Sequence, residues 1–373
     1  MAHLIKRIIL FFALPALFVL ATEFQLYYLG ESLPIEVVFQ RQREDPNVHF
    51  MRGILSQDYN VYKYLGIREF ESEILVIGSS RVMKFRQLLF SEEFTFYNAG
   101  GIAQSAHDVI QLAENFKRGD IQLPKVLIVG LDPWWFKLDY EPKTSWLIGE
   151  QMTDHAYDFE GRPSIYYFYY RSLLADRFKV NDADNLGIYA RHRGAGFRLN
   201  GSKSIEPNVV KEYLKNPGFI DREIPPIDVR IEEGLTNKFT FSQPDSLLMK
   251  KTVESLVALD ELIEEIVVYL PPFSAESYQL LGNSLNHQEW WNSYNRYFYH
   301  QLLSKFDCVI PAESPLDYDL PDDYFIDGIH PSEVFVAKQM LNYSTKNGIL
   351  GLIINEELRD DLFSAQTPLS FDL

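Results

Sequence analysis

The chain has 373 residues, of which 46% are hydrophobic and 14% aromatic, so it can bury a sizeable core and is not a disordered protein. Its formal net charge of -17 argues against a nucleic-acid partner, because phosphate binding needs a basic surface. The single cysteine, Cys308, excludes an intramolecular disulfide and a cysteine-rich metal site. We expect Cys308 to be a small buried hydrophobic residue.

The N-terminal segment predicts a membrane helix. Lys6 and Arg7 precede an apolar run over residues 8–21, and positive charge before such a run keeps the N-terminal end in the cytoplasm. Two interpretations stay open: an uncleaved anchor over 4–29, and a signal peptide cleaved after Ala21. We favour the anchor, because apolar character resumes after the end of the first run. In both cases the body of the protein is exported.

The body begins after a mixed polar and aromatic segment. Residues 74–78, Ile-Leu-Val-Ile-Gly, form an uninterrupted apolar run, which predicts a strand buried on both faces of a parallel sheet. Helix-compatible spacing over 82–89 predicts that Ser80 lies at the N-terminal end of a helix. Backbone N–H groups at that end favour developing negative charge, so Ser80 is a candidate nucleophile. Alternatively, Ser79 and Ser80 only cap the helix.

Strands and helices alternate along most of the remaining chain, which is typical of an α/β protein with a doubly wound parallel sheet. The pattern predicts further strands at 94–98, 126–130, 266–270 and 308–310, and helices from about Ser105, over 247–263, over about 288–305 and from about Ser332.

The alternation is broken by an aromatic-rich inserted segment at 136–242. Its tyrosine run, 166–170, is too dense for one buried face, so we expect part of the run to be exposed. The exposed aromatics either stack on carbohydrate or pack under the insertion, and we favour packing. The local basic segment 191–198 is either an anion or sugar contact or a solvated loop.

A second turn-prone segment supplies a candidate base. Asp327 and His330 lie three residues apart, so the carboxylate can reach one imidazole nitrogen and leave the other to take a proton from a serine. Two alternatives stay open: His330 is an ordinary loop histidine, or it binds a metal with Asp322, Asp323 or Asp327.

Four short motifs in this chain order resemble the SGNH, or GDSL-like, hydrolase superfamily. They are Gly78-Ser79-Ser80, the stretch 98–103 (Asn-Ala-Gly-Gly-Ile-Ala), Gly130-Leu131-Asp132-Pro133 and Asp327-Gly328-Ile329-His330. The third motif departs from the family, because Asp132 stands where the family has the asparagine that donates to the oxyanion. An ionised carboxylate cannot donate a hydrogen bond, and losing one such donor costs about 10²–10³ in rate.

The resemblance implies a three-layer α/β/α sandwich of SGNH or flavodoxin-like type. It implies no metal and no cofactor, with Ser80, His330 and Asp327 as the catalytic triad. The oxyanion donors would be the backbone amides of Ser80, Gly100 and Ala103. Other residues expected to line the site are Ser79, Arg81, Asp132 and Trp134.

The predicted anchor, the Gly-Ser-Ser motif and the strand end Leu-Pro-Pro-Phe at 270–273 narrow the resemblance to members that acylate envelope polymers. In these features the chain is similar to the D-alanyl lipoteichoic acid transfer protein and the alginate O-acetylation proteins. The resemblance implies a serine esterase or O-acyltransferase acting on a cell-envelope polysaccharide or acylated glycan, beside a membrane-bound O-acyltransferase. The alternative is a non-catalytic envelope-polymer assembly or binding protein on the same scaffold.

The expected localisation is a single-pass membrane protein with its body on the periplasmic or extracellular side, or a secreted protein after signal cleavage. The expected domains are an anchor or signal segment at 1–29, a stalk at 30–70, an SGNH-like domain at 71–345 that contains the insertion, and a C-terminal tail at 346–373.

Overall fold

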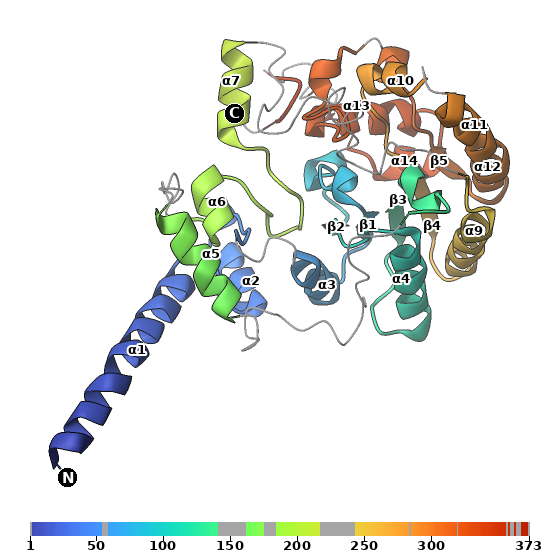
Figure 1. Ribbon diagram of the computed structural model, residues 1–373. Helices are drawn as coiled ribbons and strands as arrows, with labels where there is room; N and C mark the ends of the chain where they lie inside the picture. The colour runs from blue at the N-terminus through green and yellow to red at the C-terminus, as the bar shows by residue number, and fades with distance from the viewer. Residues whose placement is uncertain are drawn as a thin grey trace. The chain divides into compact units, whose positions relative to one another are not determined.

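The computed structural model describes most of the chain, which divides into two compact units (Figure 1). Unit 1 comprises Met1–Tyr59 and Thr153–Leu199, and unit 2 comprises Asn60–Met152 and Asn200–Leu373. The described residues are 2–53, 59–140, 162–174, 184–216, 243–282, 285–318, 320–355, 357–358, 362 and 367–371. Much of the expected insertion, at 141–161, 175–183 and 217–242, lies outside them.

Unit 2 is built on a five-stranded parallel sheet, which confirms the α/β class predicted from the sequence. The strands lie in the order β2-β1-β3-β4-β5, so the chain steps from β1 to β2 on one side and returns to β3 on the other. Such a reversal places the C-terminal ends of β1 and β3 beside each other at a switch point, where open α/β sheets hold their ligands. The bounds are β1 Ile74–Gly78, β2 Phe96–Gly100, β3 Val126–Gly130, β4 Glu265–Tyr269 and β5 Cys308–Ile310.

The strands are apolar throughout because both faces of the sheet are buried. Successive side chains point to opposite faces, so Leu75 and Ile77 belong to one hydrophobic core, and Ile74 and Val76 to another. Cys308 is buried in the second core, as predicted. Helices α4 (Ala106–Arg118) and α9 (Ser246–Asp260) contribute to the first core, and α13 (Glu333–Ser344) and α14 (Gly348–Ile353) to the second.

Of the remaining helices of unit 2, α3, α10, α11 and α12 contribute residues to the first core, whereas Val210 and Tyr213 of α7 pack in a separate small cluster with Leu369. Tyr64 and Ile67 of α3 are buried in the first core, although the sequence predicted a stalk there. The domain boundaries themselves stay a prediction. The helix bounds are α3 Tyr59–Phe70, α7 Pro207–Lys215, α10 Ala275–Gly282, α11 Leu285–Tyr294 and α12 His300–Lys305.

Two local predictions were wrong. The segment 82–89 is not an α-helix but contains two short 3-10 turns, Ser80–Val82 and Gln87–Leu89. The side-chain amide of Asn98 donates to the carbonyls of Val82 and Phe85, at 2.9 and 2.8 Å, so these carbonyls are bound to β2. The strand predicted at 94–98 is β2 and lies two residues later, at 96–100. Its bounds follow from its pairing with β1, which runs from Ile74–Phe96 to Gly78–Gly100.

Unit 1 contains the predicted membrane helix. Helix α1 (Ala2–Tyr28) is followed by α2 (Ile35–Glu44), α5 (Arg162–Leu174) and α6 (Ile188–Arg193). The window Phe11–Tyr28 has a mean hydropathy of 1.3, and only 11% of it is buried. Among the described residues, α1 is the one helix that is both long enough and apolar enough to cross a membrane. A large exposed apolar surface of this kind indicates contact with lipid or protein rather than with water.

Candidate functional site

The first part of the site is the turn at the C-terminal end of β1. Gly78 has φ +148°, and an added Cβ would lie 2.9 Å from the carbonyl oxygen of Gly130, so only glycine fits between β1 and β3. The Ser79 hydroxyl accepts a hydrogen bond from the Arg81 amide at 3.1 Å, which caps the following 3-10 turn. Ser79 is therefore the capping residue, and the side chain of Ser80 is left half-buried at the edge of the sheet.

The second part is the turn that carries Asp327 and His330. Asp327 Oδ1 accepts the backbone amides of Ile329 and His330, at 3.2 and 2.9 Å. Gly328 adopts φ +78°, which allows the chain to fold back on the carboxylate. The turn is further held by the amide of Ser274, which donates to the Gly328 carbonyl at 2.9 Å. The three-residue spacing of Asp327 and His330 does not by itself determine the conformation of this turn.

These two turns meet. Ser80 Oγ lies 2.8 Å from His330 Nε2, and His330 Nδ1 lies 2.8 Å from both carboxylate oxygens of Asp327. The carboxylate only accepts hydrogen bonds when ionised, so it holds the ring proton on Nδ1. Nε2 is then an acceptor for the Ser80 hydroxyl, which is the arrangement a nucleophilic serine requires. Asp327 is almost fully buried, whereas the His330 side chain is 27% exposed and can be reached by a substrate.

Arg81, the residue after Ser80, is only 1% exposed and contacts the turn that carries His330. Its Nε donates to the carbonyl of Ile329 at 2.8 Å, and its Nη2 donates to the carbonyl of Pro272 beyond the end of β4. The guanidinium carbon lies 5.1 Å from the Trp134 ring centroid and 4.4 Å from that of Phe273. Arg81 and Trp134 were expected to line the site, and each is 1% exposed in the structure.

Asp132 is the partner of that arginine. Its Oδ1 lies 3.1 Å from Arg81 Nη1, and the residue is fully buried after β3. Its other oxygen, Oδ2, has no hydrogen-bond partner among the described residues. The negative charge of Asp132 is therefore paired with a buried guanidinium, which would limit its repulsion of another negative charge nearby.

The expected oxyanion donors differ in their availability. The Gly100 amide donates to the Asn98 side-chain oxygen at 2.7 Å, and the Ala103 amide donates to the Gly78 carbonyl at 3.2 Å. Either amide would have to exchange that bond to hold an oxyanion. The Ser80 amide makes no hydrogen bond to any described part of the chain. Their role in catalysis stays a prediction.

The acidic residues weighed as metal ligands have other partners. Asp322 accepts the amides of Ala275 and Glu276, at 2.6 and 2.8 Å, at the start of α10. Asp323 Oδ2 accepts the Tyr213 hydroxyl at 2.7 Å. Within the described ranges, no group of three or more His, Cys, Asp or Glu side chains is arranged to hold a metal ion.

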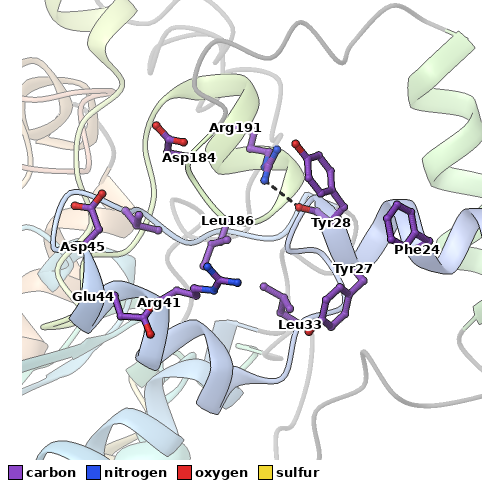
Figure 2. Close-up of a pocket in the computed structure, with 11 residues that line it drawn as sticks. Phe24, Tyr27, Tyr28, Leu33, Arg41, Glu44, Asp45, Asp184, Leu186 and Arg191 are labelled. Carbon is purple, nitrogen blue, oxygen red and sulfur yellow. Dashed lines mark hydrogen bonds between the residues drawn. The ribbon is translucent and has the colours of Figure 1, made fainter.

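Unit 1 holds a separate cavity of about 510 Å³ at the end of α1 (Figure 2). It is lined by the last aromatic residues of α1 and by charged residues of α2 and of the segment before α6. Arg191, predicted as part of a basic anion or sugar contact, donates from Nη2 to the Tyr28 carbonyl at 2.9 Å and from Nε to the Asn185 carbonyl at 2.8 Å. A cation at that position stabilises the C-terminal end of α1.

The site thus combines a serine, a histidine and an aspartate that are joined by hydrogen bonds, and a buried arginine–aspartate pair begins at the residue after the serine. Comparison of the chain with protein-family models, with curated proteins and with solved structures finds no match.

Proposed function

We propose that the chain is a membrane-anchored serine acyl esterase or O-acyltransferase that acts on ester-linked acyl groups of a cell-envelope glycan. The observation that carries this proposal is the hydrogen-bonded series from Ser80 Oγ through His330 to Asp327. The strand order and the two cores support the finer fold that the sequence resemblance implies, an α/β/α sandwich of SGNH or flavodoxin-like type. The partially exposed imidazole supports access by a polymer from solution.

The reaction follows from the protonation states. Ser80 Oγ attacks the acyl carbonyl carbon while its proton moves to His330 Nε2, and Asp327 stabilises the imidazolium through Nδ1–H. The unpartnered Ser80 amide donates to the oxyanion that forms next to it. As the tetrahedral intermediate collapses, Nε2 returns the proton to the leaving alkoxide, and the acyl group stays on Ser80. A second hydroxyl then repeats these steps: water gives hydrolysis, and a sugar hydroxyl gives transfer.

The cellular setting belongs to the same proposal. The apolar helix α1 would hold the body on the periplasmic or extracellular side, with secretion after signal cleavage as the alternative. A membrane-bound O-acyltransferase would supply the acyl group there, since an anchored acyl carrier needs a donor at the same membrane. The acceptor would be an envelope polysaccharide.

The proposal is tested by labelling the full-length protein, in membranes, with a fluorophosphonate probe that reacts with activated serines. We expect labelling of the wild type, at least 100-fold slower labelling of Ser80→Ala and His330→Ala, and retained labelling of Ser79→Ala. The last variant removes only a hydroxyl that caps a turn, which costs about 1 kcal/mol of stability. Unchanged labelling of Ser80→Ala would rule out Ser80 as the nucleophile.

One observation favours the second candidate, a non-catalytic polymer-binding or assembly protein. Two of the three expected oxyanion donors, the amides of Gly100 and Ala103, already donate hydrogen bonds to other groups of the protein. In addition, Asp132 is ion-paired and stands where the resembled superfamily has a donor. A cell in which Ser80→Ala restores polymer acylation to a deletion strain would favour this alternative. A cell in which only the wild type restores it would favour the enzyme.

A further inference from the structure

Helix α5 packs along the membrane-facing part of α1 in unit 1. The Tyr170 hydroxyl lies 2.6 Å from that of Thr22, and the Tyr170 ring stacks on Phe18 with centroids 5.1 Å apart. One turn further along α1, the Tyr169 hydroxyl donates to the Gln25 side chain at 2.9 Å. Both partners of Tyr170 lie within the apolar window Phe11–Tyr28. The contacts of α5 are thus with the segment of α1 that would meet lipid.

The direction of α5 can be read from the order of these contacts. Arg162, at its start, lies 3.4 Å from Glu23, whereas Tyr170, near its end, contacts Phe18. The helix therefore runs antiparallel to α1, toward the middle of the apolar window. At a rise of about 1.5 Å per residue, the Phe18 contact lies about 7–8 Å deeper along α1 than Glu23. This depth is similar to the one at which the apolar face of an amphipathic helix is buried in a bilayer, about 5–10 Å.

A carboxylate on α1 is neutralised where α5 begins. Glu23 forms its ion pair with Arg162 and accepts a hydrogen bond from the Tyr166 hydroxyl at 2.5 Å. Ionisable groups near the bilayer are costly unless they are paired. α5 therefore provides the partners that allow an acidic residue to lie in an otherwise apolar helix.

Several apolar side chains of α5 are exposed. Leu174 is 87% exposed, and Tyr167 and Leu173 are also exposed. A hollow of about 550 Å³ beside these residues is lined by Tyr166, Tyr167, Tyr170, Arg171 and Leu174. α5 carries two arginines and no acidic residue in a chain of net charge -17, and Arg171 makes no ion pair or hydrogen bond with the described residues. This composition suits an anionic lipid surface rather than water.

We propose that α5 is a second lipid-contacting element, a helix that runs along α1 and whose last turn enters the acyl-chain region beside it. Leu173 and Leu174 contact acyl chains, and Arg171 extends its guanidinium to the lipid phosphates while its methylene groups stay in the apolar layer. A lipid surface is favoured over a protein partner because the exposed Phe18 of α1 stacks on Tyr170, and Tyr170 lines the same hollow as the exposed Leu174. The proposal rests on the membrane anchoring proposed above, but not on the catalytic activity.

The test measures the depth of single positions in the bilayer. The full chain is reconstituted into vesicles of phosphatidylcholine and phosphatidylglycerol, and an environment-sensitive fluorophore is attached to one introduced cysteine at a time. The positions are Leu174→Cys on α5, Leu14→Cys on α1, and Leu247→Cys on α9. Leu247 is the matched control, because it is an exposed helical leucine, 60% accessible, in unit 2. The native thiol gives little background, since burial raises the pKa of Cys308 to about 12.

We expect nitroxide-labelled lipid to quench the probe at position 174 by at least half as much as the probe at 14, and to leave the probe at 247 unquenched. If 14 is quenched while 174 behaves like 247, α5 does not contact lipid and the proposal is overturned. If 174 is shielded from both lipid and aqueous quenchers, a protein surface covers α5, which also overturns it. If 14 itself is unquenched, the anchoring in the proposed function has failed.

Discussion

Arg81 follows Ser80 directly in the chain, and its guanidinium donates a 2.8 Å hydrogen bond to the carbonyl of Ile329, the residue before His330. One buried side chain thus links the turn of the proposed nucleophile to the turn of the proposed base, and it also binds the carbonyl of Pro272. Its charge is balanced by Asp132. We infer that the arginine–aspartate pair holds three strand ends in register and keeps Ser80 and His330 at hydrogen-bond distance.

The first prediction concerns Asp132→Asn, the substitution that introduces the asparagine found at this place in the superfamily that the sequence motifs resemble. If Asp132 stood at an oxyanion hole, this change would raise activity. We expect it to lower the free energy of unfolding by about 3–5 kcal/mol instead, because it leaves the guanidinium of Arg81 buried without a counterion. Urea unfolding of the full-length protein in detergent measures the effect. An asparagine variant that is as stable as the wild type and faster in ester hydrolysis would contradict it.

The second prediction concerns the arginine itself. Arg81→Lys keeps the charge, but its single ammonium cannot reach the Ile329 carbonyl, the Pro272 carbonyl and Asp132 with the geometry of the guanidinium. We expect a loss of stability of about 1–3 kcal/mol and slower fluorophosphonate labelling of Ser80. Arg118→Lys is the matched control, because Arg118 forms an exposed ion pair with Asp120. Wild-type labelling of Arg81→Lys would show that the pair does not position the triad.

The third prediction separates the orienting role of Asp327 from its structural role. Asp327→Asn retains an oxygen that can accept the amides of Ile329 and His330, but it no longer fixes the ring proton on Nδ1. We expect labelling and ester hydrolysis to fall by about 10²–10⁴ with little loss of stability, since the wrong tautomer leaves Ser80 without a base. Asp323→Asn, in the same loop, should leave both rates unchanged. Equal activity of Asp327→Asn and the wild type would refute the triad.

The sequence could predict the strands that end at the site because those strands are buried on both faces. Residues 74–78, 126–130 and 308–310 are continuously apolar, and the structure gives them those same bounds. The 82–89 segment was mispredicted because its helical spacing is a local signal. The hydrogen bonds from Asn98 to Val82 and Phe85 that decide its conformation come from a neighbouring strand.

The sequence could suggest that Ser80 and His330 lie close together only as a hypothesis, based on the chain order of the two short motifs that contain them. The role of Arg81 was not predictable at all. Its backbone acceptors Pro272 and Ile329 lie 191 and 248 residues away in the sequence, and backbone carbonyls leave no residue-specific signal. The position of α5 beside α1 was likewise hidden, because an aromatic run such as Tyr166–Tyr170 is compatible with burial under protein or under lipid.

The fourth prediction tests whether α3 belongs to the packed body. A Cβ added at Gly66 would overlap the ring and hydroxyl of the buried Tyr97, which lies on β2. Glycine to alanine normally stabilises a helix by about 1 kcal/mol, so a loss of about 1–3 kcal/mol in Gly66→Ala would report overpacking. Gly282→Ala is the control, since nothing lies within 4 Å of its added Cβ. If both variants gained stability alike, α3 would not pack on the sheet.

The fifth prediction concerns the pH dependence of stability. Burial at the start of β4, together with the nearby charges of Asp260 and Asp307, raises the pKa of Glu265 from 4.5 to about 7. Between these two values the folded state keeps a proton that the unfolded state has lost, so stability falls as pH rises from 4.5 to 7. Glu265→Gln stays neutral and should be more stable than the wild type by about 1–3 kcal/mol at pH 8, and equal to it near pH 4. Urea unfolding at both pH values measures this, and the neighbouring Glu264→Gln, which removes an exposed charge, should follow the wild type. A constant difference between Glu265→Gln and the wild type from pH 4 to 8 would mean that the pKa of Glu265 is the same in the folded and unfolded states, so that burial does not raise it.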